Sequence, residues 1–417
     1  MARYKVFLDS ANILCKPNAI QSSKVLNYLS KNGHAVVRSL GYADYIIVNT
    51  CGVSQQHEEI STALYAKYSA EKKPDAKIIS IGCLNAINEQ LSERRPEILF
   101  ISELRQLDEH FHNQVRFDDV KSAYLDEGAL PALARSETRE FDRTGKLTRQ
   151  VGAAIAGVFK RLPRGGSRTV EVIEQMHAKN RFYVEIARGC VHSCSYCIIK
   201  KARGEVSSRG VDQILSDIEA ARVPGAKLAL VADDCGSYGV DIGETLLGLM
   251  RAIAERFPEL DVHLWYLNPM WLERHEEEYL ELFAAGRVSG VNLCFQSGSD
   301  RIVKLMNRSY SVQNVFRIID RIRGVSPRTI IETHMIVGFP GEREEDFARS
   351  LEVADKVDIL ISFAYSDREG TRSAAMADKI PEKVKRARFR RLRSRTYQHL
   401  LGMVRDDLLQ QLLGKRS

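Results

Sequence analysis

The sequence predicts an α/β protein in which two parallel sheets follow one another along the chain. Three observations predict this class. Short runs rich in β-branched residues recur in both halves, helical stretches separate them, and no internal repeat indicates a solenoid. Strands that alternate regularly with helices form parallel sheets covered by helices. With 417 residues, 44% of them apolar, the chain is long enough for two or three domains.

The first domain is expected to span residues 1–115 and to be a parallel α/β sheet. Strands and helices alternate through it, each strand being followed by one helix. The expected strands are Tyr4–Leu8, Tyr45–Val48 and Lys77–Ile81, and the expected helices are Ser22–Lys31, Glu58–Glu71 and Ile87–Ser92.

Residues 116–179 are expected to be a connector or insertion. The segment mixes charged residues with Pro131, Pro163 and the breaker Arg164-Gly165-Gly166-Ser167, and one helical stretch, Leu147–Phe159, interrupts it. It is long for a connector, and nothing in the sequence assigns it a role.

A second strand–helix series, residues 180–375, is expected to form a partial parallel barrel. Six successive strand–helix units favour a barrel over a simple open sheet. The expected strands are Phe182–Ala187, Lys227–Val231, Val262–Tyr266, Gly290–Phe295, Ile330–Val337 and Asp358–Phe363, and the helices are Val211–Ala221, Gly243–Phe257, Glu276–Gly286, Val312–Arg323 and Glu344–Lys356.

Residues 376–417 are expected to be a basic helical tail, with one or two helices over Glu382–Leu413. Eight basic residues and no acidic one lie between Lys383 and Arg395. The chain carries a net charge of +7, so the rest sums to 7 − 8 = −1. The basicity therefore belongs to the tail, and it does not indicate a nucleic-acid-binding body.

The composition also bears on where the protein acts. No stretch approaches the roughly 18 apolar residues that span a bilayer, and the first apolar run ends too early for a signal peptide. Eight cysteines in a chain of this length are too few for a disulfide scaffold. We therefore expect a cytoplasmic protein with reduced thiols and no membrane contact.

The strongest chemical signal is the run Cys190-Val-His-Ser-Cys194-Ser-Tyr-Cys197, directly after the first strand of the second series. Three thiolates on one loop can bind three irons of a 4Fe–4S cluster and leave the fourth iron without a protein ligand. A structural zinc site would need a fourth ligand, which His192 is expected to be poorly placed to supply. The spacing therefore favours an iron–sulfur site with an open iron.

A second signal comes from Cys15, Cys51 and Cys83, which each follow a strand of the first domain. The carboxyl ends of parallel strands share one edge of a sheet, where ligand sites gather. Cysteines that serve only as small apolar fillers are expected within strands. We therefore expect these three thiols to converge.

The loop Cys190–Cys197, with Tyr196 before its last cysteine, resembles the signature of the radical S-adenosylmethionine (SAM) superfamily. Further motifs make the chain similar, from residue 1 to about 390, to the MiaB/RimO-like radical SAM methylthiotransferase family. They are Cys15-Lys-Pro-Asn18, Ser22-Ser23-Lys24, Asn49-Thr50-Cys51, Gly82-Cys83, Arg203-Gly204-Glu205, Ser208-Arg209, Gln296-Ser-Gly-Ser-Asp300-Arg301, Met306-Asn307-Arg308, Val337-Gly-Phe-Pro-Gly-Glu342, Tyr365-Ser366 and Glu369-Gly370-Thr371.

The resemblance implies an enzyme that inserts a methylthio group at an unactivated C–H bond, using two 4Fe–4S clusters and two equivalents of SAM per turnover. One cluster, on Cys190, Cys194 and Cys197, would bind SAM at its open iron. An auxiliary cluster would carry the sulfur, and an electron donor such as flavodoxin or ferredoxin would be needed. The auxiliary ligands would be Cys15, Cys51 and Cys83, and the cofactor-binding residues Tyr196, Arg209, Gln296, Val337 and Gly338.

The substrate is the least determined part of this interpretation. Family members that act on tRNA or on a ribosomal protein carry a β-rich TRAM domain after the barrel, and here only helical sequence follows Arg395. Without that module, we favour a polypeptide substrate, either a ribosomally made precursor peptide or a protein. The motif beginning at Gln296 is closer to the tRNA-modifying branch, so 2-methylthio modification of a tRNA adenosine stays open, with RNA contact resting on the basic tail.

The turn Asp233-Asp234 should face the barrel mouth, where it would either contact the substrate or cap a solvated helix. Of the remaining cysteines, Cys235 is expected to be a filler and Cys294 to lie inside a buried strand.

Two other functions were weighed. A cobalamin-dependent radical SAM methylase would use the first sheet for cobalamin, but no histidine is convincing as its ligand. A non-catalytic iron–sulfur sensor or carrier would not need an open iron or the loop Gly338–Glu342.

Overall fold

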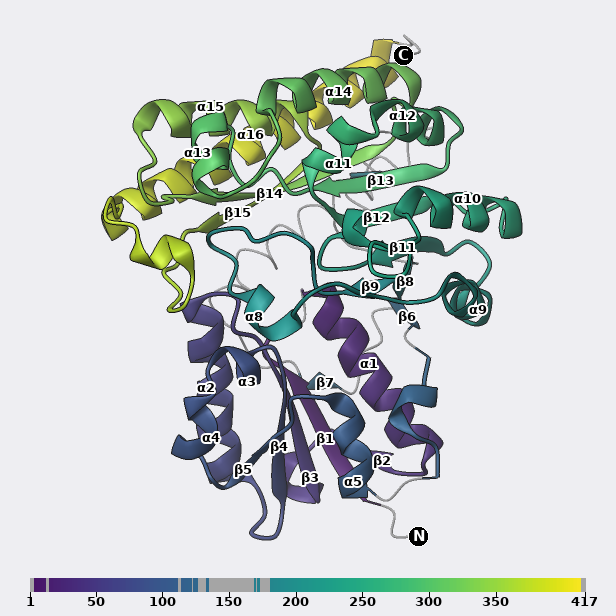
Figure 1. Ribbon diagram of the computed structural model, residues 1–417, viewed down its shortest axis with the longest axis vertical. Coiled ribbons are helices and arrows are strands. Elements are labelled where there is room, and N and C mark those ends of the chain that lie inside the picture. The colour runs from purple at the N-terminus through teal and green to yellow at the C-terminus, as the bar shows by residue number, and fades with distance from the viewer. Residues whose placement is uncertain are drawn as a thin grey trace.

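The computed structural model describes residues 4–12, 15–111, 114–121, 123–126, 133–134, 169, 171–172 and 181–413. Figure 1 shows two α/β layers stacked along the long axis, with the N-terminal sheet below and the second sheet above. The predicted α/β class with two parallel sheets is confirmed. Most of the expected connector, including the helix expected at Leu147–Phe159, lies outside the described residues.

The N-terminal sheet has the strand order β2-β1-β3-β4-β5, all parallel. Sequence analysis missed β2 and β5 because they are only two and three residues long. The strands are β1 (Lys5–Ser10), β2 (Ala35–Val36), β3 (Tyr45–Thr50), β4 (Lys77–Gly82) and β5 (Ile98–Phe100), and β7 (Leu133–Ala134) pairs in parallel with β1.

Helices cover both faces of this sheet, which is why its central strands are buried on both sides. One face packs against α1 (Lys16–Lys31) and α5 (Leu107–Phe111), and the other against α2 (Gln55–Glu71) and α4 (Gln90–Arg94). The short elements are α3 (Leu84–Ile87) and the 3₁₀ turns Leu40–Tyr42, Leu104–Gln106 and Phe117–Asp119.

Helix α1 begins at Lys16, six residues earlier than predicted. Polar residues in its first two turns, such as Asn18 and Ser22, are buried and hydrogen-bonded. Asn49 Nδ2 donates to Asn18 O at 3.0 Å and to Ser22 Oγ at 2.9 Å. Pro17 suits the first turn of a helix, because its missing N–H would have no partner there. The helix therefore starts directly after Cys15.

The second sheet has the order β15-β14-β13-β12-β11-β8-β6. Its six predicted strands are all parallel, and β6, which comes from the expected connector, adds an antiparallel edge beside β8. The strands are β6 (Ala123–Asp126), β8 (Arg181–Glu185), β11 (Lys227–Val231), β12 (Val262–Leu267), β13 (Val288–Leu293), β14 (Ile330–Val337) and β15 (Ile359–Ala364), and β9 (Ala187–Arg188) pairs with β10 (Ser207–Ser208) in a separate ribbon.

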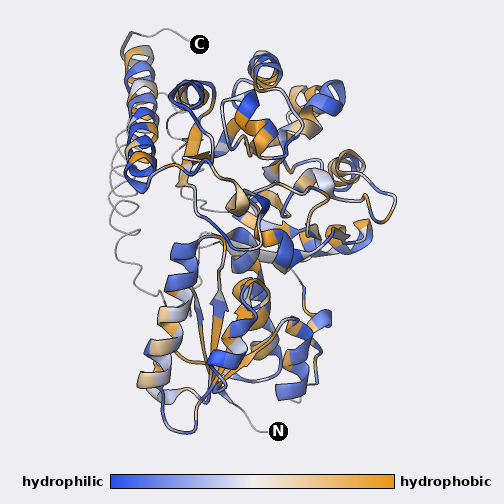
Figure 2. Ribbon diagram, turned by 60° about the vertical axis from the view of Figure 1, so that its left-hand side comes forward, coloured by the Kyte–Doolittle hydropathy of each residue, from blue (hydrophilic) through white to orange (hydrophobic). Residues whose placement is uncertain are grey.

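Amphipathic helices bury one continuous core against the outer face of this second sheet. In Figure 2 hydrophobic residues follow the strands in the interior, and hydrophilic ones occupy the outward sides of the helices. The helices are α8 (Ile199–Arg203), α9 (Val211–Ala221), α10 (Leu246–Arg256), α11 (Pro269–Arg274), α12 (Glu276–Ala284), α13 (Asp300–Leu305), α14 (Val312–Val325), α15 (Glu344–Lys356) and α16 (Glu382–Leu413), with 3₁₀ turns at Cys235–Ser237 and Arg372–Ala375.

The two sheets are joined by packed side chains. Ala19 and Ile20 of α1 form a buried cluster with residues on the inner face of β8, β11 and β12, among them Trp265. Lys16 Nζ lies 4.5 Å from the centre of the Tyr183 ring. An ion pair between Arg368 and Glu58 adds a second contact. The first half of α1 therefore fills the space inside the second sheet. The exact domain limits at residues 115, 179 and 375 stay a prediction.

The basic tail is a single helix, α16, which packs along β15 and α15 (Figure 1). Its Leu392 is fully buried in the core of the second sheet. Arg388 Nη1 donates to the buried Glu342 Oε2 at 2.8 Å, and Arg391 and Arg395 pair with acidic residues of α15. Arg386 and Arg390 are exposed. Part of the basic run is therefore used to attach the helix to the body. In the part of the chain that the structure describes, α16 and all other helices are too short or too polar to cross a membrane.

Replacing Arg388 with Ala is expected to lower the free energy of unfolding by about 3–5 kcal/mol, because it leaves the buried Glu342 carboxylate without its counter-charge. Arg390→Ala, on the exposed side of the same helix, should change it by no more than about 0.5 kcal/mol. Denaturant unfolding of the metal-free proteins would measure both values. Equal effects of the two substitutions would contradict the assignment of Arg388 as an anchor.

Candidate functional site

The loop Cys190–Cys197 lies between β9 and α8, at the carboxyl end of β8 and on the side of the second sheet that faces the N-terminal layer (Figure 1). Gly189 holds the start of the loop in place. Its φ is +78°, and a Cβ there would come within 2.0 Å of the Glu205 carbonyl oxygen. Only glycine fits this position, so the loop is fixed against the β10 segment.

Hydrogen-bond donors surround the loop thiols. His192 N lies 3.4 Å from Cys190 Sγ, and Arg308 Nη1 lies 3.5 Å from Cys194 Sγ. Burial and the Asp234 carboxylate raise the pKa of the Cys190 thiol to about 12. Burial and Cys194 raise the pKa of the Cys197 thiol to about 11, although hydrogen bonds from two backbone N–H groups lower it. The hydrogen-bond donors around the loop suit thiolates bound to a metal.

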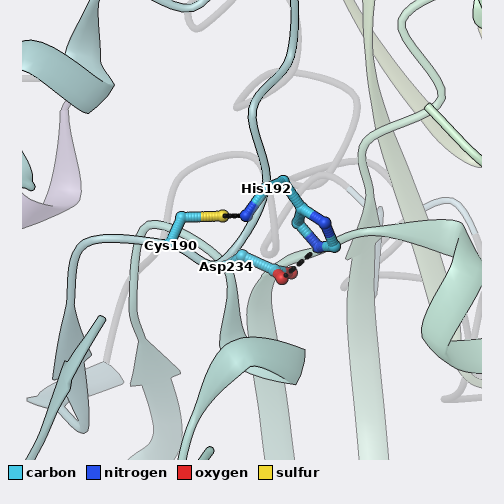
Figure 3. A group of neighbouring side chains, drawn as sticks. All are labelled: Cys190, His192 and Asp234. Atoms are coloured by element: carbon cyan, nitrogen blue, oxygen red, sulfur yellow. Dashed lines mark hydrogen bonds and ion pairs between the residues drawn. The ribbon is translucent and has the colours of Figure 1, made fainter. Parts of the chain in front are cut away.

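Cys190, His192 and Asp234 form a tight group (Figure 3), with their possible ligand atoms all within 4.8 Å. His192 Nε2 lies 3.0 Å from Asp234 Oδ2. The carboxylate also accepts hydrogen bonds from the Ser237 hydroxyl, the Asn268 N–H and the Trp271 indole N–H. Burial alone would raise the pKa of Asp234, but its hydrogen bonds hold it below the usual value. With four protein donors on it, Asp234 braces the loop through His192. Its predicted contact with substrate stays a prediction.

The structure brings Cys15, Cys51 and Cys83 to one edge of the N-terminal sheet. Cys15 lies at the N-terminus of α1, Cys51 directly follows β3, and Cys83 follows β4 at the N-terminus of α3. Burial, Cys51 and Cys83 together raise the pKa of the Cys15 thiol, because the three groups lie close to one another. Helix N-termini favour thiolates. The arrangement suits three thiolates on one metal cluster, and this role stays a prediction.

Arg203 and Asp233 connect the two groups of cysteines. Arg203 Nη2 donates to Asn18 Oδ1 at 3.3 Å, and Cys83 Sγ lies 3.9 Å from the same oxygen. On its other side, Arg203 Nε lies 4.0 Å from Asp233 Oδ1. Asp233 Oδ2 in turn accepts from Gly189 N, directly before Cys190, at 2.8 Å. The two cysteine groups are thus linked through three side chains, Asn18, Arg203 and Asp233.

Two buried nitrogen atoms beside the thiols have no hydrogen-bond partner among the described residues. They are Arg203 Nε, near the N-terminal cysteines, and Arg308 Nε, near Cys194. An unpartnered guanidinium N–H is costly to bury unless an anion lies beside it. Among the described residues no carboxylate pairs with Arg308, so the Cys190 loop fits an anionic iron–sulfur cluster. Arg203 Nε lies 4.0 Å from Asp233, and its Nη2 is the nitrogen on the side of Asn18 and Cys83.

Four of the predicted cofactor-binding residues border the region of the Cys190–Cys197 loop. Tyr196 packs with Phe339, and its hydroxyl accepts from Arg308 Nη1 at 3.3 Å. Val337 ends β14, and Gly338 N donates to Glu342 Oε2 at 2.7 Å. Gln296 has a positive φ of 68° and bridges to β14. Their cofactor role stays a prediction.

The fifth, Arg209, contacts β8 and α9. Its Nη2 donates to Asp217 at 2.8 Å, and its Nη1 to the Glu185 carbonyl at 2.7 Å. Its cofactor role likewise stays a prediction.

The placement of Cys294 corrects the sequence analysis. It was expected inside a buried strand, but β13 begins at Val288 and ends at Leu293, two residues before the predicted end. Cys294 is therefore partly exposed, and its carbonyl accepts from Arg308 Nη2 at 2.7 Å. Cys235 is fully buried, as expected, and donates to the Trp265 carbonyl at 3.0 Å.

Arg203 and Arg308 are the site residues that sequence reasoning missed. Each was only one residue of a motif shared with the family, and its distance along the chain from the cysteines did not indicate that it would lie beside them. The one available signal was their position shortly after Cys197 and after α13. A cleft of about 620 Å³ opens beside Arg203 between the two layers, and Lys24, Arg105 and Arg188 also line it.

Comparisons with known proteins cover both layers. Residues 184–354 match a family model described as the radical SAM superfamily, and residues 10–102 match one described as uncharacterized protein family UPF0004. The ribosomal protein uS12 methylthiotransferase RimO of Escherichia fergusonii is 29% identical over 96% of this chain and 83% of its own length, and RimO of Escherichia coli shows the same values. The solved structure of OxsB, a cobalamin-dependent S-adenosylmethionine radical enzyme, covers 95% of this chain and 56% of its own, with 13% identity and a TM-score of 0.48.

Proposed function

Because this chain belongs to the MiaB/RimO-like radical SAM methylthiotransferases, we propose that it inserts a methylthio group at an unactivated C–H bond of a polypeptide. The observation that carries the proposal is the link through Asp233 and Arg203 between the two cysteine groups. An insertion of this kind needs its two metal sites close together and in a fixed relation. The link provides a physical basis for both requirements.

Two cysteine groups would hold two cofactors in this proposal. Cys190, Cys194 and Cys197 would bind a 4Fe–4S cluster that also holds SAM, and the N-terminal three would bind an auxiliary 4Fe–4S cluster. When bound, these groups would supply the electron, the radical chemistry and the transferred sulfur. Two SAM molecules would be used per turnover, and a carrier such as flavodoxin or ferredoxin would supply electrons.

The protein's own residues would position these groups and exclude water. His192 and Asp234 brace the Cys190 loop from behind, and Gly189 fixes where it starts. Ala19 and Ile20 of α1 seal part of the inner face of the second sheet against solvent. A dry and rigid site of this kind protects reactive species from side reactions.

Two observations support a polypeptide rather than an RNA substrate. The relatives from Escherichia are named for methylthiolation of a ribosomal protein, uS12. The basic helix α16, which would have to grip RNA, uses Arg388, Arg391 and Arg395 to pair with the body. A tRNA adenosine is the second candidate, because Arg386 and Arg390 of the same helix remain exposed.

The direct test offers the anaerobically reconstituted enzyme peptide and protein pools in one reaction and tRNA in another. Mass spectrometry of each pool would detect a methylthio group in place of hydrogen. We expect the polypeptide pool to gain it and the tRNA pool to remain unchanged. The reverse result would assign the enzyme to the tRNA-modifying branch.

The exposed arginines allow a second test of substrate class. If RNA binds α16, the double variant Arg386→Gln/Arg390→Gln removes two phosphate contacts. The slope of the logarithm of the binding constant against the logarithm of the salt concentration then becomes less steep by about two. We expect instead no change in activity, because a polypeptide does not need this surface. Arg251→Gln/Arg349→Gln, which removes two exposed charges from α10 and α15, is the matched control. Salt-sensitive tRNA binding that only the first variant loses would contradict the proposal.

A further inference from the structure

Each of the two cysteine groups has one arginine beside it. Arg203 is the last residue of α8 and its side chain is 4% exposed. Arg308 follows α13, and its Nε is buried. In the described part of the chain, Nε of both arginines lacks a hydrogen-bond partner. The chain thus places one positive charge in each site.

The position of Arg203 is fixed by contacts on two sides. Asn18 Oδ1 accepts from its Nη2 at 3.3 Å and lies 3.9 Å from Cys83 Sγ, so the guanidinium and this thiol flank one oxygen atom. On the opposite side Asp233 lies 4.0 Å from Nε. Asp233 and Glu185 both interact electrostatically with Arg203, but among the described residues neither forms a close hydrogen-bonded pair with it. Positive charge is therefore left facing the N-terminal cysteines.

Arg308 has the equivalent position in the other site. Its Nη1 lies 3.5 Å from Cys194 Sγ and 3.3 Å from the Tyr196 hydroxyl, and its Nη2 donates to the Cys294 carbonyl at 2.7 Å. In the described residues, no carboxylate forms an ion pair with it. Its charge is thus directed at the Cys190 loop.

The physical consequence of such a charge concerns electron transfer. Reduction adds one negative charge to an iron–sulfur cluster, and a neighbouring cation stabilises that added charge. The interaction falls with distance and is strong where water is excluded, so it acts on the nearer cluster. Charge and hydrogen bonding around the sulfurs are the factors by which proteins set cluster potentials.

We propose that Arg203 and Arg308 raise the reduction potentials of the two clusters separately, Arg203 acting on the N-terminal cluster and Arg308 on the radical SAM cluster. Each is a tuning residue for one site. The inference rests on the proposed two-cluster function. In this inference, one arginine sets the potential of each cluster, and the difference between the two potentials decides which cluster accepts the electron.

Redox titration followed by electron paramagnetic resonance tests the proposal. With Cys190, Cys194 and Cys197 replaced by Ala, only the N-terminal cluster remains to be titrated. In that background Arg203→Gln should reduce the ratio of reduced to oxidised cluster at a fixed potential at least tenfold, which is 59 mV for a one-electron couple. Arg203→Lys keeps the charge and should shift the reduction potential of this cluster less. Arg308→Gln is the matched control and should leave that potential unchanged.

The complementary background, with Cys15, Cys51 and Cys83 replaced by Ala, should reverse the roles of the two arginines. A potential that Arg203→Gln does not move, or that both substitutions move equally, would overturn the inference. Loss of bound iron in Arg203→Gln but not in Arg203→Lys would support it, because charge is then what the site requires. Loss in both would overturn it, since the shape of the side chain would be what matters. If the parent background bound no iron, the proposed function itself would fail.

Discussion

Replacing Cys190, Cys194 and Cys197 together with Ala is expected to abolish cleavage of SAM to 5′-deoxyadenosine. Those three residues form the loop predicted to hold the SAM-binding cluster, and without that cluster no electron would reach the sulfonium. Iron should fall from about eight to about four atoms per chain, as for two 4Fe–4S clusters reduced to one. Chromatography of the nucleoside and iron analysis would measure the two effects.

The control for this variant is Cys235→Ala, which removes a buried thiol that donates to the Trp265 carbonyl and lies outside both groups. It should keep its iron and its cleavage activity. Cleavage that persisted after loss of the three loop cysteines would show that the loop does not hold the SAM-binding cluster.

Replacing Cys15, Cys51 and Cys83 with Ala is expected to have the opposite pattern. This variant should also retain about four irons, but it should still cleave SAM, because the loop at Cys190 is intact. Transfer of a methylthio group should be lost completely, since no site is left to hold the sulfur. Intact-mass analysis of the product, run beside the nucleoside assay, separates the two half-reactions.

The N-terminal variant has its own critical outcome. If it kept all its iron, the convergent thiols of the first sheet would not bind a cluster. Cys51 and Cys83 are both buried, so replacing them could also destabilise the N-terminal sheet, and the fold of the variant must be checked. Circular dichroism of the apo-protein would show whether the sheet still forms.

The fold could be predicted where the strands carry a strong pattern. The strands that end at Val231 and Val337 had both bounds predicted correctly, because clear turn residues flank them: Pro224-Gly225 before the first, and Pro327 and Gly338 on either side of the second. The N-terminal end of α1 could not be predicted, because Asn18 and Ser22 have polar side chains that only tertiary partners make compatible with burial. Local propensity cannot anticipate such partners.

The site shows the same division between pattern and tertiary contact. Cys15, Cys51 and Cys83 could be expected to converge, because strand ends meet at one edge whatever the packing. Asp234 could not be recognised as a brace, since its donors come from separate segments that include His192 and Trp271. Arg203 was missed for the same reason, because its neighbours near Asn18 are far away in sequence.

The buried pair between Arg388 and Glu342 bears on how the enzyme is made. Glu342 orients the backbone at Gly338, in the segment predicted to bind SAM, and its counter-charge comes from a helix that is translated after every strand of the barrel. During synthesis the barrel emerges first, with an uncompensated carboxylate in that segment, and domains fold in the order in which they emerge. The backbone at Gly338 therefore reaches its final position only after α16 has been synthesised and has docked onto the second sheet.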